Sequence, residues 1–203
     1  GFLSFTKQGV THLTGTTTLF GLALGGGRLR EAGYLLILIG SFVAGAMFSG
    51  LLIRERSLQL GRRYGVALIL EAALLCVAAL LLNAESVWGD HLASAACGLQ
   101  NAMVSTYSGA ALRTTHVSGM FTDIGIAFGT MLRGLPVDGL KFKLWSILIG
   151  AFAGGGAAGA LVFDHLGYGT LYIPAAITAA TGTGYWAYCR YRHVAMDVVG
   201  RND

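Results

Sequence analysis

The feature that most constrains this chain is a set of long apolar runs that contain no Asp, Glu, Lys or Arg. Each run reaches the roughly 20 residues that a helix needs to cross the hydrocarbon core of a bilayer. Besides the four uncharged runs, a further apolar stretch at residues 65–82 is interrupted only by Glu71. Only 12% of all residues in the chain are charged. The sequence therefore predicts an all-α fold, a polytopic transmembrane helical bundle in a lipid bilayer. The uncharged runs cover residues 32–53, 92–112, 144–163 and 166–189.

Glycine is abundant, with 31 glycines against 2 prolines in 203 residues. Because small residues let helix backbones approach closely in lipid, the glycine-rich faces predict packing within the chain, in a homo-oligomer or against a membrane-complex partner. The net charge of +4 comes from loop residues, so we expect no nucleic-acid partner. Cys76, Cys97 and Cys189 all fall in apolar runs, which predicts buried thiols and neither a metal site nor a disulfide framework.

An internal repeat organises the chain. Residues 11–25, THLTGTTTLFGLALG, match residues 115–129, THVSGMFTDIGIAFG, at seven of fifteen positions. A second block, ILIGSFVAG at 37–45, meets ILIGAFAGG at 147–155. Such self-similarity indicates one duplicated unit, so we predict two membrane repeats, residues 1–83 and 84–203, in one integral membrane domain. The first repeat lacks most of its leading helix, and we expect the native chain to begin before Gly1.

Loop charges predict that the two repeats insert upside-down relative to each other. Residues 54–63 carry four arginines, which the positive-inside rule places in the cytoplasm. The matching loop of the second repeat, residues 164–167, and the link at 83–91 contain no Lys or Arg, whereas the C-terminal tail is basic. This pattern favours inverted repeats in a bacterial inner membrane with a cytoplasmic C-terminus. Arg28 and Arg30 fall on the outer side in this scheme and weigh against it.

The repeated Thr-His-x-Thr/Ser-Gly segments predict broken or re-entrant helices. Each joins hydroxyl side chains that can cap a helix to a glycine, and such a break is tolerated at membrane depth only inside protein or beside a wet cavity. A helix that begins near Thr11 or Thr115 directs free N–H groups into that cavity and favours anionic groups. Lys7 and Arg113 lie nearby and add positive charge. The alternative is that these residues serve only close helix packing.

Two histidines and two carboxylates complete the candidate site. His12 and His116 occupy equivalent positions beside the breaks, where they either bind solute and protons or link helices by hydrogen bonds. Asp123 follows His116 by two helical turns, on the same face. We assign possible proton coupling to Glu71, His116 and Asp123, and no metal. The candidate substrate-binding residues are His12, Thr14, Gly15, Asn101, Arg113, Thr115, His116, Ser118, Gly119 and Asp123.

Enzymatic motifs do not emerge from the sequence. The stretch GAFAGGGAAG has no phosphate-binding lysine and lies inside an apolar run, which favours helix packing. We find no GxSxG or HExxH motif and no paired acids. The sequence therefore predicts a protein that is not an enzyme and needs no cofactor.

A further set of motifs is distributed along the chain: Gly1-Phe2-Leu3, His12-Leu13-Thr14-Gly15, Gly98–Ala102, Arg113–Thr115, Ser118-Gly119 and Thr122–Gly125. Together these motifs resemble the YoaK-like family of bacterial integral membrane proteins, which has no known function. The resemblance covers nearly the whole chain and is most specific in its centre. It implies a membrane location and a repeat-built fold, and it supplies no substrate. Thr16 departs from the family, which often has Asn there.

Two functions are consistent with these features. The first is a small-solute transporter or channel with a site at the two helix breaks, for an anionic or weakly acidic solute. The alternative is a non-transporting membrane subunit or scaffold that packs against a larger complex. A solvated cavity that reaches both His12 and His116 would favour the first.

Overall fold

The computed structural model describes residues 13–53, 62–107 and 116–199, and within these ranges the regular structure is helical. The predicted all-α fold is confirmed. Along the chain the helices are α1 (Leu13–Gly25), α2 (Leu29–Leu52), α3 (Arg62–Asn83), α4 (Trp88–Tyr107), α5 (Val117–Leu132), α6 (Gly139–Leu166), the 3-10 helix η1 (Gly167–Leu171) and α7 (Tyr172–Val199).

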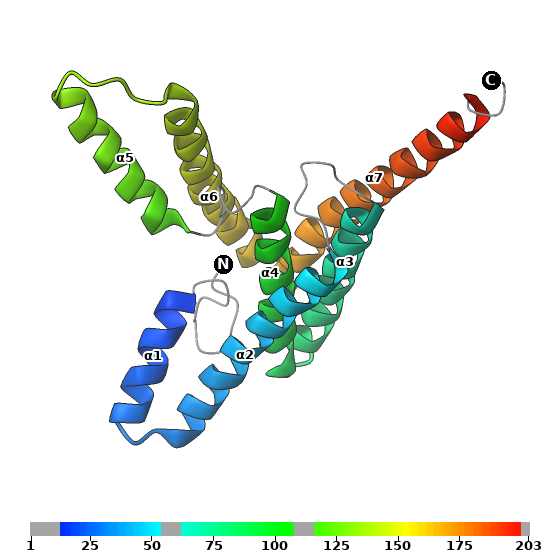
Figure 1. Ribbon diagram of the computed structural model, residues 1–203. Coiled ribbons are helices and arrows are strands. Elements are labelled where there is room, and N and C mark those ends of the chain that lie inside the picture. Colours follow the sequence, from blue (N-terminus) through cyan, green and yellow to red (C-terminus); the bar gives the residue numbers. More distant parts are fainter. Residues whose placement is uncertain (1–12, 54–61, 108–115, 200–203) are drawn as a thin grey trace.

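Four helices form the packed centre of the molecule. α4 lies between α2 and α3, and α3 also packs along α7 (Figure 1). α1 folds back on α2 after the short turn at Gly26–Arg28, and α5 folds back on α6 in the same way. Figure 1 shows these two hairpins as separate arms of an open structure. The shape leaves large apolar surfaces uncovered by the chain itself.

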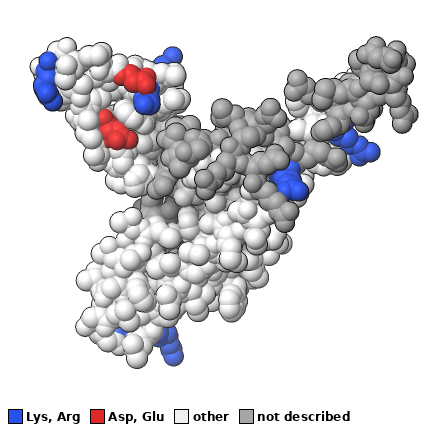
Figure 2. Space-filling view, in the orientation of Figure 1, with Lys and Arg blue, Asp and Glu red and all other residues white. Residues whose placement is uncertain are grey.

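Three helical segments are long and apolar enough to cross a membrane. They are α2, residues 63–83 of α3, and the continuous stretch 139–191 that contains α6, η1 and most of α7. On the face shown in Figure 2, most of the described surface is uncharged, and the few charged side chains lie on the arm of α5 and α6, at the tip of the arm of α1 and α2, near the start of α3 and along α7. Exposed apolar side chains on helices of this length are what a lipid-facing surface requires. The chain is a helical membrane protein.

α2 and α4 are parallel and pack in a constant register. The Tyr34 hydroxyl donates to Asp90, and four residues further the Ser94 hydroxyl donates to the Leu38 carbonyl. Another turn along, a Cβ built on Gly98 would overlap the backbone carbonyl of Phe42. The pairing therefore repeats every four residues on both helices, one ridge against the other. Only a residue without a side chain permits this approach at position 98.

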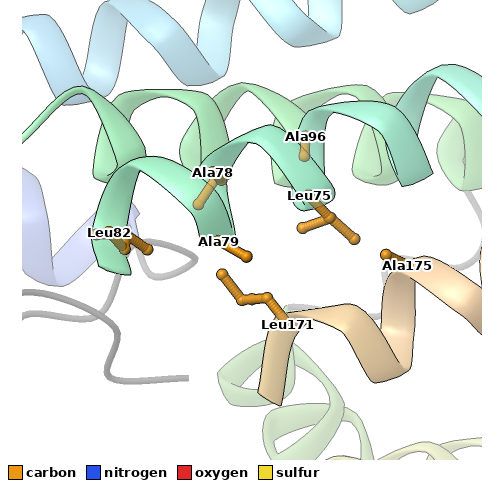
Figure 3. Close-up of a cluster of buried hydrophobic side chains, with 8 residues drawn as sticks. Leu75, Ala78, Ala79, Leu82, Ala96, Leu171 and Ala175 are labelled. Atoms are coloured by element: carbon orange, nitrogen blue, oxygen red, sulfur yellow. The ribbon is translucent and has the colours of Figure 1, made fainter. Parts of the chain in front are cut away.

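α3 and α7 pack antiparallel and are also joined through small residues. Cβ atoms built on Gly65 and on Gly182 would each lie 2.9 Å from the other glycine's carbonyl oxygen. At the opposite end of the pair, Leu75 and Ala79 of α3 contact Leu171 and Ala175 in a buried cluster. Figure 3 shows the side chains of this cluster between the two helices. The predicted role of glycine in helix packing is thus realised at several positions of the centre.

The α5–α6 hairpin differs from the packed centre. α6 starts at Asp138, whose carboxylate accepts hydrogen bonds from the backbone N–H groups of Leu140 and Lys141, and such a cap stabilises the first helical turn. None of the residues of α6 is buried, and Cβ atoms built on its glycines from Gly150 to Gly159 would meet nothing within 4 Å among the described residues. The glycine-rich face of α6 is therefore open, unlike that of α2. The three cysteines, expected to be buried, are only half-buried.

Candidate functional site

The structure places part of the predicted site. His12, Arg113 and Thr115 lie outside the described residues, as does Lys7. Thr14 and Gly15 are exposed in the first turn of α1. Ser118 is exposed and Gly119 half-buried in the first turn of α5, and His116 immediately precedes that helix. The meeting of the two breaks remains a prediction from the sequence.

α1 and α5 share details at equivalent positions of the predicted repeat. α5 begins at Val117, and the residue 104 positions earlier, Leu13, is the first described residue of α1. The Thr18 hydroxyl donates to the carbonyl of Thr14, and the Thr122 hydroxyl donates to that of Ser118, both at 3.0 Å. The buried positions also match, since α1 buries Thr16 and Ala23 and α5 buries Met120 and Ala127.

The start of α5 explains the glycine in Thr-His-x-Ser-Gly. His116 occupies the capping position, is exposed and makes no capping hydrogen bond with its side chain. Its ring lies where a Cβ on Gly119 would stand. The helix begins at Val117, near Thr115 as predicted, and a histidine occupies the capping position that we expected a hydroxyl residue to take. Gly119 is required for the position of the imidazole.

The two hairpins combine a short helix with a long one. α1 has 13 residues and α2 has 24, which corresponds to about 20 Å and about 36 Å. α5 has 16 residues and α6 has 28, or about 24 Å and about 42 Å. Because α1 is joined to α2 by a short turn and packs on it, Leu13, the first described residue of α1, lies about halfway along α2. In Figure 1, α1 and α5 run in opposite directions away from the middle of the molecule.

Glu71 is the most deeply buried of the predicted site residues that the structure describes. Only 3% of its surface is exposed, and its Oε2 atom is buried without a hydrogen-bond partner among the described residues. The carboxylate lies near enough to the Cys97 thiol of α4 to act on it electrostatically. Along α3, Glu71 lies about 18 Å from Asn83, where the helix ends. This is close to the depth of Leu13, the first described residue of α1.

Other members of the predicted site are not gathered around Glu71. Asp123 is half-buried on α5, and α5 packs only on α6 in the part of the chain that the structure describes. α1 and α5 do not pack on each other there. Asn101 is half-buried and lies one helical turn after Cys97 on α4, on the same face of that helix. In the described part of the chain, α3 and α4 therefore meet at Glu71 and Cys97, and Asn101 lies one turn after Cys97 on α4.

A second polar cluster, which the sequence analysis assigned to a link, lies where α2 and α4 begin and α3 ends. We call this the Asp90 end of the bundle. Asp90 and His91 are 1% and 6% exposed, and the Tyr34 hydroxyl donates to Asp90 Oδ2 at 2.7 Å. The His91 ring lies 5.2 Å from the Tyr34 ring and 5.5 Å from the Trp88 ring, between centroids. The sequence contained one signal for this buried cluster, because Asp90 and His91 directly precede the apolar run that begins at Leu92.

Burial perturbs both groups of this pair, which precede that apolar run. Burial raises the pKa of Asp90, and the hydrogen bond from Tyr34 opposes this rise. Burial lowers the pKa of His91. In both residues the protein interior disfavours the charged form. The described residues contain no group of three or more His, Cys, Asp or Glu side chains arranged to hold a metal ion.

Comparison with known proteins identifies the family. Residues 1–184 match a family described as "Protein of unknown function (DUF1275)". The chain belongs to this family. No curated protein and no solved structure matches it significantly. The expected membership of an uncharacterised family is confirmed, and the YoaK-like name itself stays a resemblance. The family carries no assigned substrate, so function has to be argued from the residues.

Proposed function

We propose that this DUF1275 protein is a small-solute transporter or channel of the bacterial inner membrane. Its site lies at mid-depth, at the level of Glu71 and of the helix starts that the sequence predicts near His12 and His116, and it takes an anionic or weakly acidic solute. The observation that carries this proposal is the Glu71 carboxylate, which is buried in an apolar span with an unpartnered oxygen. Ionisable residues within a membrane are costly and are retained mainly where they bind ions, protons or substrates.

The predicted helix starts support the same location. Leu13, the first described residue of α1, lies about halfway along α2, at a depth similar to that of Glu71. Short helices that begin inside a membrane direct positive dipole ends toward bound groups, as in transporters with inverted repeats. The equivalent hydrogen bonds and buried positions of α1 and α5 are consistent with two such repeats. In this proposal the solute's negative charge faces the helix starts near His12 and His116.

Glu71 has a specific task in the proposal. A carboxylate beside an anionic solute repels it, whereas a protonated carboxyl group donates a hydrogen bond to it. We therefore assign Glu71 as the group that binds a proton together with the solute. The solute enters as its anion, the proton resides on Glu71, and both leave on the other side. His116 and Asp123 remain further candidates for this proton. The proposed function is transport without covalent chemistry.

Flux through reconstituted protein tests the proposal. The full chain is placed in liposomes that contain a pH-sensitive dye, and lactate, phosphate, sulfate or chloride is added outside. We expect at least one of these anions to acidify the lumen about tenfold faster than in protein-free liposomes. Glu71→Gln should lower that rate by about tenfold or more, because the amide cannot carry the proton.

The matched control is Glu85→Gln in the exposed turn between α3 and α4, which should leave the flux unchanged. Absence of flux for every anion would contradict the transporter proposal. Unchanged flux in Glu71→Gln would remove Glu71 from the site. A double substitution of His12 and His116 by Gln tests the helix starts in the same assay, and normal flux in that variant would contradict their role.

A second function is favoured by one observation, the open face of α6. None of the residues of this 28-residue helix is buried within the chain, and its glycines face open space among the described residues. In a non-transporting membrane subunit, such a face packs against another protein. Purification in mild detergent distinguishes the two functions, because a scaffold should retain a stoichiometric partner chain, whereas a transporter should be active alone.

A further inference from the structure

Two membrane spans end together where α3 begins and α7 leaves its apolar stretch. The apolar span of α3 begins at Arg63, and the stretch that contains α7 ends at Tyr191. These ends lie side by side, because a Cβ built on Gly65 would be 3.0 Å from the Cβ atom of Trp186. We call this region the Arg190 end of the bundle. It marks one boundary of the hydrocarbon core, and Figure 2 shows positive side chains near the start of α3 and along α7.

Arg190 is held in place on an aromatic ring at this boundary. Its guanidinium carbon lies 5.5 Å from the centroid of the Trp186 ring, one helical turn earlier on α7, which is within the range of a cation–π contact. Trp186 is half-buried, whereas Arg190 is exposed. Among the described residues, no carboxylate forms an ion pair with Arg190. The planar guanidinium therefore presents N–H donors in a fixed arrangement that suits a carboxylate or a phosphate.

Charge and depth together define the ligand of these donors. Residues 54–63, which lead into α3, contain four arginines against Glu55, and residues 185–199 contain two arginines against Asp197. Both segments therefore carry a net positive charge. Tyr188 and Tyr191 are 57% and 79% exposed, and aromatic side chains of this kind lie at the level of lipid headgroups. An acceptor that carries negative charge at this depth is the phosphate of an anionic lipid.

We propose that the Arg190 end binds the headgroup of an anionic phospholipid, with the Arg190 guanidinium donating hydrogen bonds to the phosphate oxygens. Arg63, exposed in the first turn of α3, adds positive charge to the same boundary. The acyl chains extend into the hydrocarbon core along the apolar spans. Because Trp186 packs on Gly65, a lipid held there also supports the contact between α3 and α7. The proposal is independent of Glu71 and of transport.

Thermal unfolding in the presence of defined lipids tests the proposal. The full chain in dodecyl maltoside micelles receives phosphatidylglycerol or phosphatidylcholine with the same acyl chains. We expect phosphatidylglycerol to raise Tm by about 5 °C more than phosphatidylcholine, since a ligand that binds the folded state stabilises it. Arg190→Gln should abolish this difference while it leaves Tm in phosphatidylcholine unchanged. Arg190→Lys keeps the charge but loses the planar fork, and it should retain about half of the difference.

Native mass spectrometry of the same samples measures binding without reference to stability. The parent chain should retain phosphatidylglycerol, and Arg190→Gln should retain about fivefold less. Trp186→Leu should also retain less, because the guanidinium is no longer held. The matched control is Arg30→Gln, which removes an exposed charge from the start of α2 at the opposite end of the bundle and should change neither readout, as should Glu71→Gln.

Three results would overturn the lipid site. The first is an equal Tm in the two lipids, and the second is unchanged lipid retention in Arg190→Gln. The third is a matching rise in Tm with inorganic phosphate alone, which would show that a free anion is the ligand, since inorganic phosphate has no acyl chains. Equal losses in Arg30→Gln and Arg190→Gln would also contradict the proposal, because they would reflect net charge and not the Arg190 end.

Discussion

At the scale of residues, two positions of this protein differ from what close packing alone would favour. Glu71 is buried in the apolar helix α3, which packs on α4, and its Oε2 atom has no hydrogen-bond partner among the described residues. Gly119, by contrast, has no side chain, and this leaves room for the His116 ring. Both residues are poor choices for packing alone. A carboxylate that is kept for its chemistry should lower stability relative to an apolar residue of similar size.

Replacing Glu71 by leucine tests this cost. We expect Glu71→Leu to raise the free energy of unfolding by about 1–3 kcal/mol, because the buried unpartnered oxygen is removed, while flux in liposomes is lost. Denaturant titration in mixed micelles measures the stability. Glu85→Gln, in the exposed turn, should change it by less than about 0.5 kcal/mol. A loss of stability in Glu71→Leu would show instead that the carboxylate is well paired.

At the scale of helices, long uncharged apolar runs predicted most of the elements but not their ends. The uncharged run at 32–53 became α2 at Leu29–Leu52, with a shift of a few residues. α4 begins at Trp88, four residues before the predicted run, because Asp90 and His91 pack into the bundle instead of remaining in a polar link. Tertiary contacts thus decided that boundary. Composition alone does not show that Tyr34, 56 residues away, supplies a partner for Asp90.

The predicted site was less completely recovered than the fold. α5 begins at Val117, near the predicted start at Thr115, and the residues before α1 lie outside the described part of the chain, so the paired breaks stay a prediction. Asp123 was grouped with Glu71 because both are carboxylates within apolar segments. The sequence does not show which helices are neighbours, and α5 and α3 do not pack together in the described part of the chain.

The α2–α4 contact gives the prediction that belongs to this scale. A Cβ on Gly98 would overlap the Phe42 carbonyl, so Gly98→Ala should separate the helices and destabilise the protein by about 1–3 kcal/mol. Gly154→Ala on α6 is the matched control, because nothing described lies within 4 Å of its Cβ. That variant should be neutral or gain up to about 1 kcal/mol from helix propensity. Equal destabilisation of both variants in mixed micelles would contradict the close α2–α4 contact.

For the whole molecule, the order of helices fixes which loops share a side of the membrane. α2 and α4 begin, and α3 ends, at the Asp90 end, so the α1–α2 and α3–α4 turns lie together there. The turn between α5 and α6 carries Arg133 and precedes Lys141 and Lys143. Positive charge of this kind is retained in the cytoplasm. With α5 and α1 running in opposite directions, the two hairpins should enter the bilayer from opposite sides.

Site-specific labelling tests this inverted arrangement. In a variant in which all three native cysteines are replaced by alanine, we place one cysteine at Ala84 in the α3–α4 turn or at Leu135 in the α5–α6 turn. A membrane-impermeant maleimide should label Ala84→Cys in intact cells and Leu135→Cys only after the cells are opened. Labelling of both positions from the same side would exclude inverted repeats, since short turns cannot cross the hydrocarbon core without paired backbone groups.

Arg28 and Arg30 oppose the proposed orientation, so a cysteine at the neighbouring Gly26 should report their side directly. Outside labelling there would show that the basic α5–α6 turn and the C-terminal tail outweigh this pair of arginines in setting topology.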